Sequence, residues 1–388
     1  MKATTETDID AQARDCLGRD RFGGAAPEDP VPPAEIREPP ERTFADFVRD
    51  HRRLLLALLA AAAATVFVFA VLPQIAGLGE TLKRLGHGSK GWLALGLGFE
   101  VLSIAGYVAV FRAVFCCEGV EIGWSENYQI TLAGIVATKI FAAAGAGGVA
   151  LTAWALRASG LSGRTVARRM TALEILLYGV YMAALVIFGL GLASGLFGGD
   201  SPASLTLVPA AFGATVIALV LASRFLPGDI GRRLRRFSGG SERRRRGLER
   251  VSAVPATLRD GIATAIALLR RPRPGLAGAI LYWAFDIATL WATFRAFGGS
   301  PPVAVVVMAY YVGTLANLIP IPGGIGGVEG GMIGCFIAFG VNGSTAVLAV
   351  LSYRALSFWL PTLPGTVAYF QLRQTVGRWR GGEAVQPA

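Results

Sequence analysis

Six ionisable residues lie inside long apolar stretches of this sequence, and they are the side chains with which it could do chemistry. They are Glu100, Lys139, Glu174, Asp286, Glu329 and Arg354. A charged side chain at the centre of a bilayer costs on the order of 2.5 to 3.5 kcal/mol on insertion scales, so each is a candidate for function. Such groups can replace the hydration shell of a charged molecule that passes between helices. The alternative for each is a structural ion pair.

Residues for other kinds of chemistry are scarce. Histidine, the commonest general base, occurs only as His51 and His87. The cysteines at positions 16, 116, 117 and 335 show no metal-ligand spacing, and the vicinal pair Cys116 and Cys117 cannot easily form a disulfide with itself. We therefore expect no metal, no cofactor and no enzyme activity.

The elements that must position these residues are apolar helices. Hydrophobic residues make up 53% of the chain and charged residues 16%, with a mean hydropathy of +0.52. Runs of about 20 apolar residues, each enough for ~30 Å of helix, predict an all-α polytopic integral membrane protein. The apolar stretches lie at about 54–72, 91–111, 128–143, 147–156, 170–195, 204–226, 275–297, 303–319, 325–339 and 345–371.

Basic residues indicate which loops are cytoplasmic, and the net charge of +11 comes mainly from arginine. Residues 1–42 are rich in proline and predict a disordered cytoplasmic tail, followed by a transmembrane domain at 43–375 and a second cytoplasmic tail at 376–388. The connection 227–274 carries thirteen arginines. Its apolar residues between Leu248 and Leu269 recur at helical spacing, which predicts a helix in the headgroup plane; a solvated basic loop is the alternative. Nucleic-acid binding is not expected.

An internal duplication is visible when residue n is compared with residue n+180. The segments 160–165 and 340–345 share both glycines and the threonine, Gly147 falls on Gly327, and Glu174 falls on Arg354. Residues 157–169 carry four arginines, whereas 337–349 carry no charge. The two copies, at about 91–195 and 275–371, are therefore expected to face opposite sides of the membrane.

Each copy contains a helix-breaking run inside an apolar segment. A bilayer core has no water to satisfy a broken backbone, so such runs survive only beside protein or a water-filled cavity. Inverted repeats with broken segments are typical of transporters with a site near the midplane, although tight helix packing is an alternative. We expect two broken or re-entrant hairpins whose turns contain Gly145, Gly147, Gly148, Pro320, Pro322, Gly323, Gly324, Gly326 and Gly327.

We expect the six ionisable residues to line the path of a substrate between the two predicted hairpins. Lys139 and Glu329 flank the two hairpin turns and are expected to contact a charged headgroup. Glu174 and Arg354 occupy equivalent positions and are expected to pair across the pseudo-two-fold axis. Tryptophans such as Trp283 are expected to be interfacial anchors.

The last third of the sequence resembles the flippase-like membrane domain of lysylphosphatidylglycerol synthases and their stand-alone, UPF0104-like relatives. The residues that carry this resemblance are Pro322-Gly323-Gly324-Ile325-Gly326-Gly327-Val328-Glu329, Gly340-Val341, Leu351-Ser352-Tyr353-Arg354, Trp359-Leu360-Pro361 and Gly365. Glu329 and Arg354 match the family's characteristic acid and arginine, and Glu174 matches an acid of the first half. The first half departs from the family's pattern because it lacks a proline near Gly145. No role from the family can be assigned to Lys139. The full synthases also have a soluble aminoacyl-transferase domain, so synthase activity is not implied.

The resemblance implies movement of lipid between leaflets, with an anionic or aminoacylated phospholipid as the expected partner. We expect a multi-pass protein of the inner cell membrane with both termini in the cytoplasm. Two alternatives remain open, namely an accessory subunit or transferase of lipid-linked glycan or polyprenyl-lipid metabolism, and a small-solute or ion transporter. Short outer loops disfavour the transferase. A lipid substrate requires a cavity open sideways to the bilayer.

Overall fold

The computed structural model describes residues 87–115, 122–140, 146–197, 202–223, 242–271, 273–318 and 326–380. The chain divides into two units, Met1–Asp50 and His51–Ala388, and every described residue belongs to the second. The predicted N-terminal tail and the predicted first span at 54–72 lie outside the described residues.

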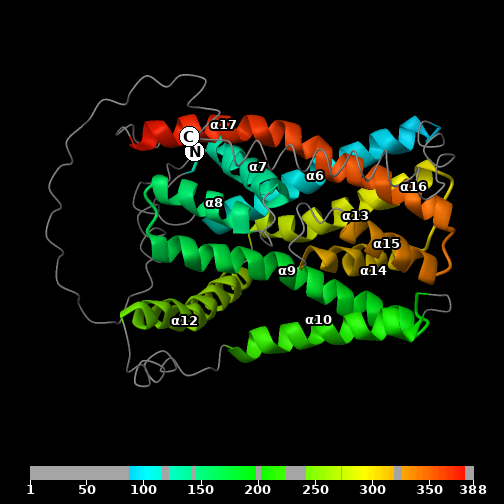
Figure 1. Cartoon of the computed structure of the whole chain (residues 1–388), viewed down its shortest axis with the longest axis horizontal. Helices are drawn as coiled ribbons and strands as arrows, with labels where there is room; N and C mark the ends of the chain where they lie inside the picture. Colours follow the sequence, from blue (N-terminus) through cyan, green and yellow to red (C-terminus); the bar gives the residue numbers. More distant parts are fainter. Residues whose placement is uncertain are drawn as a thin grey trace, which may run out of the picture. The chain divides into compact units, whose positions relative to one another are not determined.

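Every regular element in this part of the chain is a helix, which confirms the all-α prediction (Figure 1). The helices are α6 (Lys90–Phe115), α7 (Trp124–Ile140), α8 (Ala146–Ala158), α9 (Gly163–Ala193), α10 (Ala203–Ser223), α12 (Glu242–Arg270), η2 (Pro274–Ala277), α13 (Gly278–Ala296), α14 (Val303–Thr314), η3 (Leu315–Leu318), α15 (Gly327–Ala338), α16 (Gly343–Arg354), η5 (Ala355–Trp359) and α17 (Leu360–Arg380). The helix α17 therefore continues five residues into the region predicted as a C-terminal tail.

Five of these helical stretches are long and apolar enough to cross a membrane, so the protein is a multi-pass membrane protein. They are Lys90–Phe115, Gly163–Ala193, Ala203–Ser223, Pro274–Ala296 and Gly343–Arg380. The helices α14 and α15 have 12 residues each. At ~1.5 Å per residue each is about 18 Å long, well short of a ~30 Å hydrocarbon core. The second hairpin is thus built from helices too short to cross on their own.

The helices α6 and α13 pack against each other in antiparallel orientation. Ser89 N donates to Ala296 O at 2.9 Å near one end, and Ser103 Oγ donates to Tyr282 O at 2.8 Å further along. The two backbones approach closely at Gly106, because a Cβ there would lie 2.9 Å from Tyr282 N. A side chain at this position would force the two backbones apart.

Each hairpin packs against the long helix of the other copy. On α7, Gln129 Oε1 accepts from Thr375 Oγ1 of α17 at 2.9 Å. On α9, the hydroxyl of Tyr181 donates to the carbonyl of Tyr311 of α14. Figure 1 shows the hairpin of α7 and α8 opening toward one end of the helix bundle and the hairpin of α14 and α15 opening toward the other. An inverted repeat would have this arrangement, but the repeat itself and its orientation in a bilayer both stay predictions.

The same turn occurs in both copies. Gly160 and Gly340 both have positive φ, at 98° and 80°, where an L side chain would be strained. Two residues later Ser162 caps α9 by accepting from Thr165 N, and Asn342 caps α16 by accepting from Thr345 N, each at 3.2 Å. The duplicated segments of the sequence thus have the same local structure.

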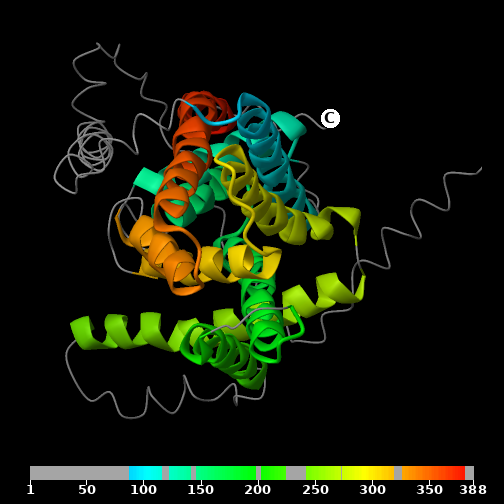
Figure 2. The same ribbon diagram turned by 90° about the vertical axis from the view of Figure 1, so that its right-hand side faces the viewer.

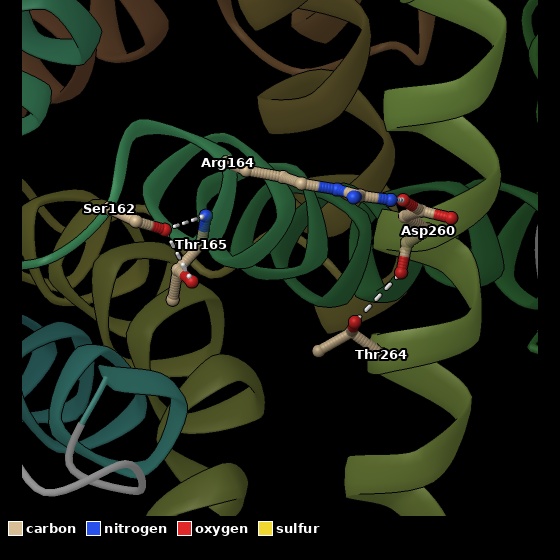
Figure 3. Close-up of polar contacts among 5 residues, drawn as sticks. All are labelled: Ser162, Arg164, Thr165, Asp260 and Thr264. Carbon is tan, nitrogen blue, oxygen red and sulfur yellow. Dashed lines mark hydrogen bonds and ion pairs between the residues drawn. The ribbon is translucent and has the colours of Figure 1, made fainter. Parts of the chain in front are cut away.

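The predicted basic helix is present as α12, and it lies across the direction of α9 and α10 (Figures 1 and 2). Ile262 and Ala265 are buried, and Gly261 lies against Thr171 of α9. Figure 3 shows the polar contact beside this seam, where Arg164 Nη2 lies 3.6 Å from Asp260 Oδ2. The location of α12 in the headgroup plane stays a prediction.

Candidate functional site

A buried ion pair joins α15 to α16. Arg354 Nε donates to Glu329 Oε1 at 2.7 Å, and the two side chains are only 11% and 8% exposed. Arg354 is the last residue of the 12-residue helix α16, which puts it about 18 Å from the start of that helix. A buried ion pair in a membrane protein is costly, so it requires an explanation in structure or in function.

The start of α15 holds Glu329 in place. Glu329 lies in the first helical turn, where its Oε2 accepts from Gly326 N at 2.7 Å. This bond is half of a capping box, and the positive end of the helix dipole also favours the carboxylate there. Gly326 has φ of 86°, which a residue with a side chain rarely adopts. Gly326 therefore permits the turn that aims the carboxylate of Glu329 at Arg354.

A widened turn follows Arg354. Pro361 has no N–H to donate to the carbonyl of Ser357, and residues Ala355–Trp359 directly before it form a π-helical turn. The guanidinium of Arg354 lies 5.0 Å from the ring centre of Phe358, within range of a cation–π contact. Such π-helical turns are frequent at functional sites because they re-aim side chains.

A second polar cluster contains Glu100 of α6 and Asp286 of α13, which are 4% and 9% exposed. The Tyr310 hydroxyl donates to Asp286 Oδ2 at 2.5 Å. Both acids also interact electrostatically with the hydroxyls of Tyr282 and Tyr353. The helices α6, α13, α14 and α16 thus contribute to one buried cluster of acids and tyrosines.

The two clusters meet at α16. Tyr353 is the neighbour of Arg354 and interacts electrostatically both with that arginine and with the two acids. Tyr353 therefore lies between the acid–tyrosine cluster and the Glu329–Arg354 pair along α16. The packing of α6, α13 and α16 thus brings Glu100, Asp286 and Arg354 into one region, and their role in a substrate path stays a prediction.

The predicted pair between Glu174 and Arg354 is wrong, because Arg354 bonds to Glu329. Glu174 instead lies near the hydroxyls of Tyr107 and Tyr178. The prediction relied on equivalent positions in the two copies, whereas α15 and α16 are packed neighbours and bring their own acid and base together.

The predicted hairpin turns are described only in part. Gly145, Pro320, Pro322, Gly323 and Gly324 lie outside the described residues, and so does the side chain of Lys139, which is in the last turn of α7. Gly147 and Gly148 lie in the first turn of α8, and Gly327 begins α15, so these three are beside the turns and not in them. Gly148 permits close packing, since a Cβ there would lie 2.5 Å from the carbonyl oxygen of Gly134 on α7.

The tyrosines of the second cluster were missed by the sequence reasoning. Tyr310 and Tyr353 are fully or almost fully buried. Trp283, expected at an interface, instead donates from Nε1 to Leu177 O at 2.8 Å and contacts the rings of Tyr181, Tyr310 and Tyr311. The available signal was a tyrosine hydroxyl inside an apolar stretch, because a buried hydroxyl needs a partner.

Comparison with known proteins identifies the family. The family model described as "Lysylphosphatidylglycerol synthase TM region" matches residues 54–365, most of the chain. The chain belongs to this family. Two UPF0104 membrane proteins of Methanothermobacter thermautotrophicus are 27% and 24% identical to it, over 84% and 78% of this chain and 96% and 92% of their own length. A UPF0104 membrane protein of Pyrococcus horikoshii is 31% identical over 30% of this chain and 36% of its own length. The resemblance inferred from residues 322–365 is thus confirmed.

Proposed function

We propose that the protein is a lipid translocase, which moves a phospholipid or another amphipathic lipid between the leaflets. The observation that carries this proposal is the buried Glu329–Arg354 pair, whose acid lies in the first turn of a helix too short to cross the membrane. A headgroup in transit needs charged protein groups in place of water inside the bilayer. Membership of the lysylphosphatidylglycerol synthase transmembrane family supports a lipid as the cargo.

The chemistry of transfer would be an exchange of partners. A lipid phosphate competes with the Glu329 carboxylate for the Arg354 guanidinium, because guanidinium binds both kinds of oxyanion. The released carboxylate can then pair with a cationic part of the headgroup, such as the ammonium of an aminoacyl group. The pair thus matches both charges of an aminoacylated phospholipid, and its arginine alone matches an anionic one. In this proposal the protein binds and moves its cargo without acting as an enzyme.

The distribution of arginine supports an orientation. The start of α9, the crossing helix α12 and the end of α17 lie at the same end of the bundle, and all three carry arginines. Because basic residues mark the cytoplasmic side, we propose that this end and both termini face the cytoplasm of an inner membrane.

The test is transfer of headgroup-labelled phospholipids in liposomes that contain the purified protein. Glu329→Gln keeps the hydrogen bond to Gly326 N but loses the charge, and Arg354→Gln removes the guanidinium. We expect either change to reduce transfer at least about tenfold, because a charge-assisted bond contributes about 1.5 to 3 kcal/mol. Lysyl-phosphatidylglycerol and phosphatidylglycerol are compared as cargo.

The control is the exposed pair of Arg164 and Asp260, whose side chains are 87% and 39% exposed. Arg164→Gln and Asp260→Asn remove similar charges from the surface and should leave transfer unchanged. Wild-type rates equal to those of protein-free liposomes, or full transfer by both buried-pair variants, would overturn the proposal. Transport of a water-soluble solute in place of lipid would indicate the solute-transporter alternative.

A further inference from the structure

Four aromatic rings contact one another in series where α6, α9 and α13 pack together. The ring centre of Tyr107 on α6 lies 5.2 Å from that of Tyr282 on α13, and the ring centres of Tyr282 and Trp283 are 4.8 Å apart. The ring centre of Trp283 lies 6.4 Å from that of Tyr178 on α9. The bond from Trp283 Nε1 to Leu177 O at 2.8 Å ties α13 to α9 beside the last two rings. These four residues, Tyr107, Tyr178, Tyr282 and Trp283, form an aromatic patch to which three helices contribute.

The acid Glu174 lies beside the aromatic patch. Glu174 and Tyr178 are four residues apart on α9, a spacing that puts two side chains on the same face of a helix. Glu174 also interacts electrostatically with the hydroxyls of both Tyr107 and Tyr178. The carboxylate is therefore next to rings from two different helices.

The aromatic patch is accessible from outside the helix bundle. Tyr178 is 51% exposed, and Glu174 and the other three rings are partly exposed. Gly179, which follows Tyr178, is exposed, and a Cβ there would meet no atom within 4 Å. A group that approaches α9 from the side can therefore reach both the rings and the acid.

Aromatic faces and a carboxylate together match the chemistry of an ammonium group. The face of a Trp or Tyr ring attracts a cation that lies within about 6 Å of the ring centre, and quaternary or alkylated ammonium groups are recognised by clusters of such rings. A carboxylate adds the opposite charge. Packing of the rings alone would serve the fold, but packing does not need an acid on the exposed side of an apolar helix, where it is costly.

We propose that the aromatic patch and Glu174 form a binding site for the ammonium group of a lipid headgroup. Its use in lipid transfer rests on the proposed translocase function, whereas ammonium binding itself does not. The site is formed by α6, α9 and α13, whereas the Glu329–Arg354 pair joins α15 to α16. The protein thus has one site for an ammonium group and a separate arginine for a phosphate. This favours phospholipids that carry an amine over purely anionic ones as the cargo.

Equilibrium binding of tail-labelled fluorescent lipids to the purified protein in detergent tests the site without any transfer. Lysyl-phosphatidylglycerol and phosphatidylglycerol are compared, because they differ in the lysyl group with its ammonium groups. The wild type is expected to bind the lysyl lipid at least about fivefold more tightly, within the range of cation–π and charge contacts. Tyr178→Leu, which removes an exposed ring, and Glu174→Gln, which removes the charge, should each reduce the preference to about twofold or less. Tyr178→Phe restores a ring and should recover most of the preference.

The control variant is Phe212→Leu, which removes a 40% exposed ring from α10 and should keep the wild-type preference. If Glu174→Gln fails to fold, the comparison of Leu with Phe at position 178 gives the same readout at an exposed position. Equal binding of the two lipids by the wild type, or a preference that survives both Tyr178→Leu and Glu174→Gln, would overturn the site.

A water-soluble amine distinguishes a lipid headgroup from a free solute as the ligand. Lysine methyl ester, added at the concentration of the lysyl lipid, should leave that lipid bound to the wild type. Displacement by the ester as effective as that by unlabelled lysyl-phosphatidylglycerol would overturn the lipid headgroup as the ligand. A binding preference together with no transfer in liposomes would overturn the translocase and leave the ammonium site standing.

Discussion

At the scale of single residues, the Glu329–Arg354 pair is the contact on which the proposed function depends. Glu329 is held from two sides, by Gly326 N and by Arg354 Nε, each at 2.7 Å. The removal of one member leaves the other charged in a buried place, which costs more than the removal of both. Comparison of the single variants with the double variant therefore separates a role of the pair in stability from a role in lipid transfer.

We predict that Glu329→Gln and Arg354→Gln each lower the free energy of unfolding by about 3 to 5 kcal/mol, as is typical for a broken buried pair. The double variant should recover most of this loss, because two neutral amides can bond to each other. It should still fail to transfer lipid. Thermal unfolding in detergent and the liposome assay give the two readouts. A double variant with wild-type transfer would contradict a functional role for the pair.

At the scale of helices, the seam between α6 and α13 depends on small residues. Gly106 lies against the backbone of Tyr282, whereas a Cβ at Gly98 of the same helix would meet no atom within 4 Å. The two glycines therefore have different roles despite their similar sequence surroundings.

We predict that Gly106→Ala lowers the free energy of unfolding by about 1 to 3 kcal/mol, because the added methyl group overpacks the seam. In contrast, Gly98→Ala should leave it unchanged or raise it by up to about 1 kcal/mol, since alanine is the better helix former. Thermal unfolding of the two variants under the same conditions checks this. Equal effects of the two changes would mean that the seam is not closely packed.

Helices and their ends were the most predictable part of the fold. The apolar stretch predicted at 170–195 corresponds to α9, which ends at Ala193, and the paired segments at 160–165 and 340–345 carry local signals for the same turn. The partners within the site were less predictable. Arg354 pairs with Glu329, and not with Glu174 as predicted, because α15 packs on α16. Tyr310 bonds to Asp286 because α14 lies beside α13. Neither contact is encoded in spacing along the chain.

At the scale of the whole molecule, the two copies are expected to face opposite sides of the membrane. Arg164 and Ser344 are equivalent positions 180 residues apart, each directly after the first residue of its helix. Both lie on the surface of the helix bundle.

We predict that Arg164→Cys is labelled only from the cytoplasm by a membrane-impermeant maleimide, and that Ser344→Cys is labelled only from outside. The cysteines at 16, 116, 117 and 335 are first replaced with serine so that they do not react. Labelling in intact cells and in inverted membrane vesicles separates the two faces. Reaction of both positions from the same face would show that the copies are parallel.

The packing of each hairpin on the other copy's long helix has a consequence for how the protein can be assembled. Gln129 of α7 meets Thr375 of α17, and Tyr181 of α9 meets Tyr311 of α14, so either half alone would expose surfaces that only the other half can cover. A chain cut within 227–241, between α10 and α12, should therefore yield two fragments that are unstable when expressed singly and that bind each other when expressed together. If the two halves interlock in this way, we expect that neither half can be removed without unfolding the one that remains.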